Sequence, residues 1–324
     1  MKRRTLLGAA AALPFAAGTA PAQGSWPSER PIRIVITYPP GGTSDFVART
    51  FANQLGQQLG QSVVVENRSG GGGVIGWTNV VRSAPDGYTF LLTDNSLATA
   101  PALLPNLGFD INADLTPVSL LVDYPCIVVV GPEVQASTMG EFVALAKSRQ
   151  NDQLFYGSMG NGSSPHLYAE LLQDQSGMKM THVPYRGMGP AFTDLLAGRV
   201  ALLIAAPATV MAAIKAGRVK ALAIGTPGER IPALPDVPTL KELGFDFTYS
   251  FWYGLLAPKG LPQPIAARMQ AEVKKAFEVP EFRNRFVEQG GVPVAGDGEA
   301  LAKVMRTDYT VWGGMIRERN IKPD

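Results

Sequence analysis

The sequence predicts an α/β protein of two domains, each a mainly parallel sheet flanked by helices. Short apolar runs typical of buried strands alternate with helix-like stretches over residues 32–93. The same alternation restarts after a long apolar run at residues 118–130. The roughly 300 residues that follow the N-terminal segment are also more than one core comfortably holds.

The first unit reads as a βαβαβ arrangement, in which a parallel sheet is covered by helices. Its expected elements are strand 32–37, helix 46–59, strand 63–66, helix 74–83 and strand 89–93. The second unit repeats this order. Its expected elements are helix 139–149, strand 154–156, helix 165–175, strand 182–184, helix 191–196, strand 200–205, helix 208–216 and strand 221–224.

Two long apolar runs bracket the second unit, at residues 118–130 and 251–257, and we expect them to cross between the domains. Helices 265–277, 280–289 and 298–316 then close the chain, and we expect them to pack on the first unit. This organisation makes domain 1 discontinuous, residues 23–124 plus 250–324, and domain 2 residues 125–249. Two linking strands form a hinge, and the cleft between domains is the expected ligand site.

Residues 1–22 are typical of an export signal peptide. Lys2-Arg3-Arg4 is followed by an apolar run at residues 5–17 and by Ala20-Pro21-Ala22. This predicts a periplasmic protein cleaved near Ala22, with the ordinary secretory and twin-arginine routes both open. Removing the three basic residues changes the formal charge from +2 to −1. No later run approaches ~20 apolar residues, so we expect no membrane insertion of the mature chain. No polybasic run remains either, so we expect no nucleic-acid binding.

Cofactor and metal chemistry finds little support in the composition. Cys126 is the only cysteine, and in its apolar run it reads as a core residue. Two histidines, His166 and His182, are too few for a histidine-rich metal site. We therefore expect no metal and no cofactor.

Two glycine-rich loops stand out, at residues 39–45 and 157–165. Each follows a predicted strand and opens a predicted helix, and each carries hydroxyl side chains. Such a turn presents backbone N–H groups at the positive end of a helix dipole, so each loop is a candidate anion site. One loop in each unit suggests two jaws that close on one ligand.

Several neighbouring residues have structural explanations. We expect Ser164 to be a helix N-cap with Pro165 at the first helical position. Asp45 stabilises the first turn of its helix, so we assign function to the loop amides before it. Arg186 follows a strand and either pairs with an anion or is solvated.

Two enzyme interpretations compete with binding. Gly71-Gly72-Gly73-Val74-Ile75-Gly76 matches a dinucleotide fingerprint, but the residues at 67–70 lengthen a turn that the fingerprint needs tight. Ser163 and Ser164 near His166 suggest an exported hydrolase, yet a histidine on the same helical turn is badly placed as a base. We therefore expect no enzyme activity.

Six motifs in order resemble the Bug-type solute receptors, the extracytoplasmic binding components of tripartite tricarboxylate transporters. The resemblance runs from about Trp26 to the C-terminus. The motifs are Tyr38-Pro39-Pro40-Gly41-Gly42 with Asp45, Val63-Val64-Val65-Glu66-Asn67-Arg68, Pro85-Asp86-Gly87-Tyr88-Thr89, Gly160-Asn161-Gly162-Ser163-Ser164-Pro165-His166, Val183-Pro184-Tyr185-Arg186-Gly187 and Leu234-Pro235-Asp236-Val237-Pro238-Thr239.

The resemblance implies a type II periplasmic-binding-protein fold that closes on a small carboxylate and delivers it to integral membrane transporter subunits. It implies a monomer, and a ligand-sensing partner of a membrane sensor kinase is the alternative role. The implied ligand-binding residues are Tyr38, Pro40, Gly41, Gly42, Thr43, Asn95, Ser96, Ser158, Met159, Gly160, Asn161, Gly162, Ser163, Ser164, His166, Tyr185, Arg186 and Ala206.

The chain departs from the family pattern at residues 198–207. Relatives commonly carry an aspartate and an aromatic residue there, whereas this chain ends the strand with Ile204-Ala205-Ala206. If that strand end faces the cleft, an ammonium group of the ligand lacks a partner. We therefore expect an apolar or bulkier di- or tricarboxylate or aromatic acid rather than an acidic amino acid.

Overall fold

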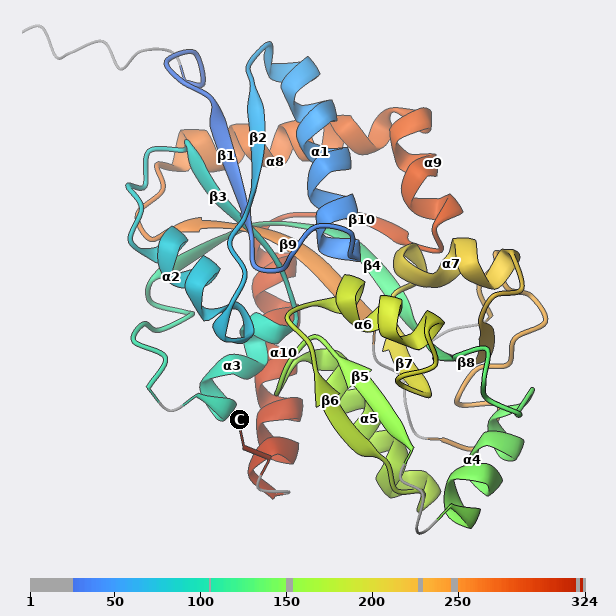
Figure 1. The fold of residues 1–324 in the computed structure, drawn as a ribbon. Helices are drawn as coiled ribbons and strands as arrows, with labels where there is room; N and C mark the ends of the chain where they lie inside the picture. Colours follow the sequence, from blue (N-terminus) through green and yellow to red (C-terminus); the bar gives the residue numbers. More distant parts are fainter. Residues whose placement is uncertain are drawn as a thin grey trace, which may run out of the picture.

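The computed structural model describes residues 26–104, 106–149, 154–226, 230–245, 250–318 and 321–322. The predicted export signal, residues 1–22, lies outside the described residues. The described chain is an α/β protein in which one curved sheet runs through two halves, each flanked by helices (Figure 1). The strand order is β2-β1-β3-β9-β4-β7-β5-β6, with β8 and β10 both pairing with β4.

The first half begins with a parallel sheet whose two faces are both covered. Ile34 packs in a cluster with Phe51, while its neighbour Val35 packs in another with Trp77. Burial of both faces explains why these strands read as continuous apolar runs rather than alternating ones. The elements are β1 (Ile32–Ile36), α1 (Thr43–Leu59), β2 (Val63–Asn67), the 3₁₀ turn η1 (Gly71–Gly73), α2 (Val74–Val81), β3 (Thr89–Asp94) and α3 (Ser96–Leu103).

The second half repeats the design around the parallel strands β7, β5 and β6. Its first helix starts with a capping box, in which the Thr138 hydroxyl accepts the Glu141 N–H at 3.2 Å and the Glu141 carboxylate accepts the Thr138 N–H. The elements are α4 (Met139–Ser148), β5 (Phe155–Ser158), α5 (Ser164–Ser176), β6 (Thr181–Pro184), α6 (Met188–Leu196), β7 (Leu202–Ala205), α7 (Pro207–Lys215) and β8 (Lys220–Gly225).

Strand β4 (Leu115–Val130) belongs to both halves. Its first part, as far as Pro125, pairs antiparallel with β9 (Ser250–Pro258) and with β10 (Val292–Gly296). From Cys126 onward it lies between β7 and β8. The expected crossing of the run 118–130 matches β4, whereas β9 pairs only with β3 and with the first part of β4. The domain boundaries given above stay a prediction.

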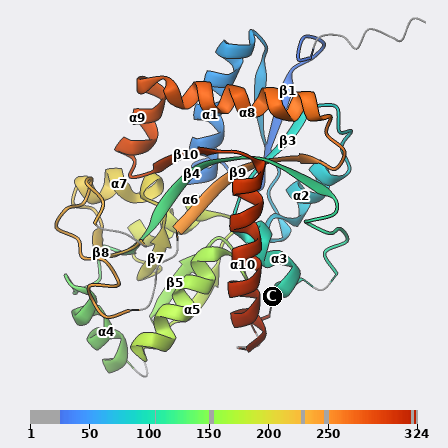
Figure 2. The ribbon, with the colours of Figure 1, turned by 180° about the vertical axis from the view of Figure 1, so that it is seen from behind.

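Three C-terminal helices complete the molecule: α8 (Gln263–Glu278), α9 (Pro280–Glu288) and α10 (Gly298–Glu318). Helix α9 packs on α1, with the rings of Phe46 and Phe286 5.8 Å apart. Helix α10 runs down the back between α3 and α5 (Figure 2). Its Trp312 lies 5.0 Å, ring to ring, from Tyr168 of α5, so the last helix contacts both halves.

Sequence patterns missed helix α3 and strand β10 and placed some ends wrongly. Pro101 lies inside α3, and Pro293 lies inside β10, where the pairing with β4 also shifts register. Both prolines hide the usual signals of their elements. The expected strand at 200–205 begins at Leu202. Cys126 is buried as expected, and burial raises the pKa of its thiol to about 12.

Within the described ranges, no helix is both long enough and apolar enough to cross a bilayer.

Candidate ligand-binding site

The first glycine loop connects β1 to α1 and leaves the start of that helix without a side-chain cap. Gly42 occupies the N-cap in an extended conformation, and among the described residues no side chain accepts the first helical N–H groups there. Gly41 has φ +97°, a conformation that L side chains rarely adopt. The loop therefore presents backbone N–H groups and the positive end of the α1 dipole toward the second half.

Asp45 fixes the back of this loop. Its carboxylate accepts the Gly41 N–H at 3.3 Å, the Arg49 Nε–H at 2.9 Å and the Asn67 amide at 3.2 Å. Burial favours a higher pKa for Asp45, but these hydrogen bonds lower the pKa overall. Asn67 also donates to the Tyr38 carbonyl at 2.9 Å. Asp45 lies in the first turn of α1, as expected from the sequence, and it also positions the loop and occupies the Gly41 N–H.

The second glycine loop connects β5 to α5 and is held by internal hydrogen bonds. Ser163 occupies the N-cap, and its hydroxyl donates to the Gly160 carbonyl at 2.7 Å. The prediction that Ser164 is the N-cap is wrong. Ser164 is the first helical residue, and its buried hydroxyl has no hydrogen-bond partner among the described residues. With Ser163 bonded inside the loop, the start of α5 also lacks a side-chain cap.

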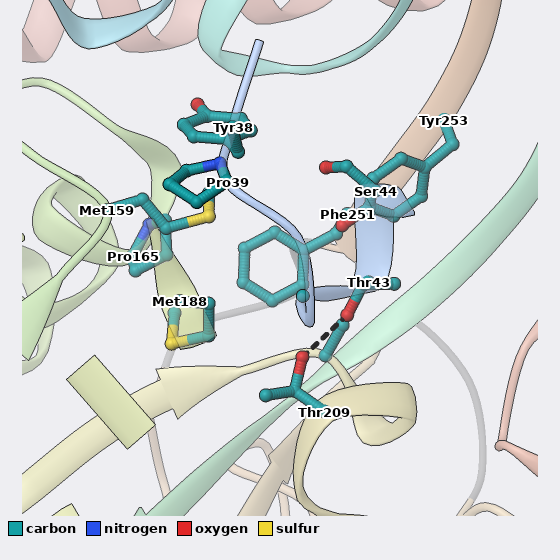
Figure 3. A pocket seen from close by; sticks show the side chains of 12 residues that line it. Tyr38, Pro39, Thr43, Ser44, Met159, Pro165, Met188, Thr209, Phe251 and Tyr253 are labelled. Atoms are coloured by element: carbon teal, nitrogen blue, oxygen red, sulfur yellow. Dashed lines mark hydrogen bonds between the residues drawn. The ribbon is translucent and has the colours of Figure 1, made fainter. Parts of the chain in front are cut away.

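The two loops face each other across a cavity of about 20 Å³. Its first-half wall includes Thr43, whose hydroxyl is hydrogen-bonded at 2.8 Å to that of Thr209 on α7 (Figure 3). A cavity of this size holds about one water molecule, so the halves are closed on each other. The lining residues are Tyr38, Pro39, Gly42, Thr43, Ser44, Met159, Pro165, Met188, Ala206, Thr209, Phe251 and Tyr253.

Glycines in the second half allow this close approach. A Cβ atom on Gly187 would lie 2.8 Å from Pro39 Cδ, and one on Gly189 would lie 3.3 Å from the Pro40 carbonyl oxygen. Gly162 of the second half packs against Leu103 on α3 of the first half. A Cβ atom on Gly162 would lie 1.9 Å from Leu103 Cδ1. These contacts join the halves on both sides of the cavity.

A larger cavity of about 350 Å³ lies between η1 and α3 of the first half and the second glycine loop. Arg186 is exposed and supplies its cationic group. The lining residues are Gly71, Gly72, Trp77, Ser96, Ala100, Leu103, Leu104, Gly160, Asn161, Gly162, Ser163, Pro184, Tyr185 and Arg186. This space has room for part of a small ligand beside the closed loops.

The predicted site residues divide into three groups. The smaller cavity includes Tyr38, Gly42, Thr43, Met159 and Ala206. The larger includes Ser96, Gly160, Asn161, Gly162, Ser163, Tyr185 and Arg186. Neither lining includes Pro40, Gly41, Asn95, Ser158, Ser164 or His166.

Residues in this third group support the loops or the region between the halves. The Asn95 amide donates to the Tyr168 hydroxyl at 2.9 Å and to the Ser250 carbonyl at 3.0 Å, which joins β3 to α5 and β9. Ser158 is fully buried, and its hydroxyl lies 2.6 Å from His182 Nε2. Ser158 therefore contacts His182 and belongs to neither cavity lining.

Around the smaller cavity, sequence reasoning missed four lining residues outside the two glycine loops: Met188, Thr209, Phe251 and Tyr253. Met188 and Thr209 lie near the starts of α6 and α7, directly after strands, and that position is a usable signal in α/β proteins. Phe251 and Tyr253 lie on crossing strand β9, and their place in the site depends on how that strand pairs with β3 and β4.

A buried carboxyl group lies behind the first loop. Asp94 is fully buried, its Oδ1 accepts the Ser96 N–H at 3.0 Å, and burial raises its pKa to about 6. Burial and then the nearby Asp94 charge raise the pKa of Tyr38 well above its usual value, and the Tyr38 hydroxyl donates to Ser96 Oγ at 3.1 Å. An anion would therefore be favoured at the loop amides and disfavoured deeper, beside Asp94.

This fold and this arrangement define a solute-binding protein of the periplasmic type, in which a ligand lies between two α/β halves. The model of the tripartite tricarboxylate transporter family receptors matches residues 47–321, and the chain belongs to that family. Protein BugT of Bordetella pertussis is 36% identical over 314 residues, which cover 96% of this chain and 94% of BugT.

Solved structures agree with this assignment. The R. palustris protein Rpa4515 with adipate has a TM-score of 0.88 and 30% identity, covering 92% of this chain and 100% of that one. MatC from Rhodopseudomonas palustris with bound malate has a TM-score of 0.84 and 31% identity, covering 89% and 99%. The expected periplasmic-binding-protein fold is confirmed.

Proposed function

We propose that this chain is an exported periplasmic receptor that captures a small carboxylate between its two glycine loops and delivers it to integral membrane subunits of a tripartite tricarboxylate-type transporter. The observation that supports it most directly is the meeting of two uncapped helix starts, α1 and α5, at one interdomain site. The relatives with adipate and malate are carboxylate-bound members of the same fold. We infer that the receptor works as a monomer without catalysis.

Two loops are needed for useful affinity. A receptor that works at micromolar ligand concentration needs about 8 kcal/mol of net binding free energy. Hydrogen bonds to a charged group return roughly 1.5 to 3 kcal/mol each, against an association cost of several kcal/mol. One loop with two or three N–H donors therefore barely breaks even. Both loops must contact the ligand, and they do so only when the halves close about β4 and β9.

The walls favour a carboxylate with an apolar body. Met159, Met188 and Phe251 line the smaller cavity. The Ala206 methyl group also lines it, at the strand end where the sequence predicted the loss of a polar contact. These side chains offer no anionic partner to an ammonium group. Methionine side chains are flexible enough to move aside for different ligand bodies. We therefore propose di- or tricarboxylates or aromatic acids over aspartate or glutamate.

A ligand panel tests this assignment. We expect the melting temperature to rise with adipate, malate, citrate or phthalate, and calorimetry to give tighter binding for these acids than for aspartate and glutamate. Tight binding of aspartate or glutamate would refute the proposed ligand class. No stabilisation by any carboxylate would refute the receptor assignment itself.

A matched pair of variants tests the site. Gly42 has φ −95°, and a Cβ there would lie 3.9 Å from Met188 Cβ, so Gly42→Asp is accommodated and places a negative charge at the first loop. We expect it to abolish the thermal shift. Gly140→Asp adds the same charge at an exposed position of α4 with open space around it. It should bind like the parent, and equal binding by both variants would contradict the proposed site.

A further inference from the structure

Two stacked histidines lie behind the second glycine loop. The rings of His166 on α5 and His182 on β6 are 4.0 Å apart, centroid to centroid, and 5° from parallel. The Tyr156 ring of β5 continues the stack, 4.9 Å from His182. These are the only histidines of the chain, and the sequence separates them by a whole helix.

Each ring is hydrogen-bonded to the second glycine loop. His166 Nδ1 accepts the Gly162 N–H at 2.9 Å, and His182 Nε2 lies 2.6 Å from the Ser158 hydroxyl. That hydroxyl also accepts the Gly160 N–H at 3.0 Å. Because His166 accepts at Nδ1, its ring is neutral and carries its proton at Nε2. The loop backbone is therefore positioned by side chains that lie behind it.

The peptide that His166 holds also contacts the opposite half. The Thr99 hydroxyl of α3 donates to the Gly162 carbonyl at 3.3 Å, and Gly162 packs against Leu103 of the same helix. A change at His166 Nδ1 is consequently transmitted, through one residue, to the contact between the halves.

We propose that His166 and His182 are positioning residues for the second ligand loop, and that ligand capture requires His166 to be neutral, so that acid weakens binding. This inference rests on the proposed receptor function. A proton on Nδ1 converts the acceptor into a donor that points at another donor, the Gly162 N–H, and the hydrogen bond is lost. Two charged rings at 4.0 Å would also repel each other, so at most one ring carries a charge.

The groups that face the two stacked rings determine which protonation state of His166 is favoured. His166 Nε2 lies 4.0 Å from the Glu170 carboxylate, which favours the protonated ring. Glu170 also accepts the Tyr156 hydroxyl at 2.5 Å and the Gln173 amide at 3.0 Å. Ser158 faces His182. The adjacent carboxylate favours the protonated ring, and the loss of the Gly162 hydrogen bond opposes protonation.

Three variants separate positioning from simple packing. His166→Asn keeps an acceptor oxygen at the Nδ1 position and does not titrate, whereas His166→Leu keeps an apolar side chain without the acceptor. His182→Gln keeps a polar atom at the Nε2 position. We expect His166→Leu to weaken adipate binding at every pH from 4.5 to 8. His166→Asn should restore binding relative to His166→Leu and remove most of the pH dependence.

The parent protein should lose up to tenfold in adipate affinity per pH unit below the midpoint of the His166 titration. Asp94 and Asp308, whose pKa values burial raises to about 6 and about 7, change charge in the same range, but they remain in every variant. The difference between the parent and His166→Asn therefore reports His166. Identical pH profiles for these two proteins would overturn the proposal.

A second readout needs no ligand. NMR signals of the two imidazole rings follow their titration, and hydrogen exchange of the Gly162 amide, corrected for its intrinsic pH dependence, follows the loop. We expect protection of this amide to fall as His166 titrates in the parent and to stay constant in His166→Asn. Protection that ignores the His166 titration would refute the inference. If adipate fails to bind at any pH, the ligand proposal fails while this readout still decides the histidine proposal.

Discussion

Replacing Gly162 by alanine tests whether ligand binding closes the halves, as we propose. Gly162 has φ +71°, and an alanine in this left-handed conformation costs roughly 1 to 2 kcal/mol wherever the second half is folded. That cost lowers the stability of the open and closed forms alike. It should reduce the melting temperature without affecting ligand affinity.

A steric clash with Leu103 destabilises the closed form alone. The new Cβ would lie 1.9 Å from Leu103 Cδ1 and 2.9 Å from Leu103 Cγ, so the leucine has to move. Leu103 is 5% exposed and packs in the core, which leaves little room. Overpacking of this kind costs typically 1 to 3 kcal/mol. Because Leu103 and Gly162 lie in opposite halves, we expect affinity to fall by roughly 5- to 150-fold.

Calorimetry with the tightest-binding acid of the panel measures this loss. Leu103→Ala removes the obstructing side chain, so the double variant Leu103→Ala/Gly162→Ala should bind more tightly than Gly162→Ala alone. Leu103→Ala by itself supplies the reference for the lost packing. Parent-like affinity of Gly162→Ala, or a double variant that recovers nothing, would refute the closure geometry.

Two further predictions concern the inner wall and the region between the halves. Thr209→Val removes the hydroxyl that is hydrogen-bonded to Thr43 at 2.8 Å. We expect calorimetry to show ligand affinity reduced roughly 2- to 10-fold. Unchanged affinity would argue against this contact in the bound form. Burial raises the Asp308 pKa from 3.8 to about 7, so its stabilising contribution is fully present below the unfolded pKa and is lost as pH rises through about 7. Asp308→Asn keeps an acceptor for the Trp252 N–H. We expect this variant to be more stable than the parent at pH 8, by up to about 4 kcal/mol, and the two stabilities to converge near pH 4. Equal melting temperatures at pH 8 would contradict this prediction.

The sequence was informative wherever one short segment carried the whole signal. The first glycine loop, its position after a strand and the role of Asp45 follow from local chemistry, since capping and helix dipoles act within one turn. Helix α3 was not predictable in this way, because Pro101 breaks its pattern and its contacts with α10 stabilise it.

Contacts between distant segments were beyond local patterns. Thr209 meets Thr43 only because the two halves close. The hydrogen bond from the Gly162 N–H to the His166 ring was not predicted, and a ligand contact by His166 stays a prediction. Helical or strand periodicity carries no information on which ring will stack on His182, since that depends on how α5 packs against β6.

The path of the chain through β4 and β9 has a consequence for folding order. Strands β5 to β8 pair with one another or with β4, so they find their partners soon after synthesis. By contrast, Leu91 of β3 lies opposite Leu256 of β9, and β10 pairs with β4 near the end of the chain. Contacts of such long sequence separation form slowly. The first half therefore stays incomplete until almost the whole chain has been made.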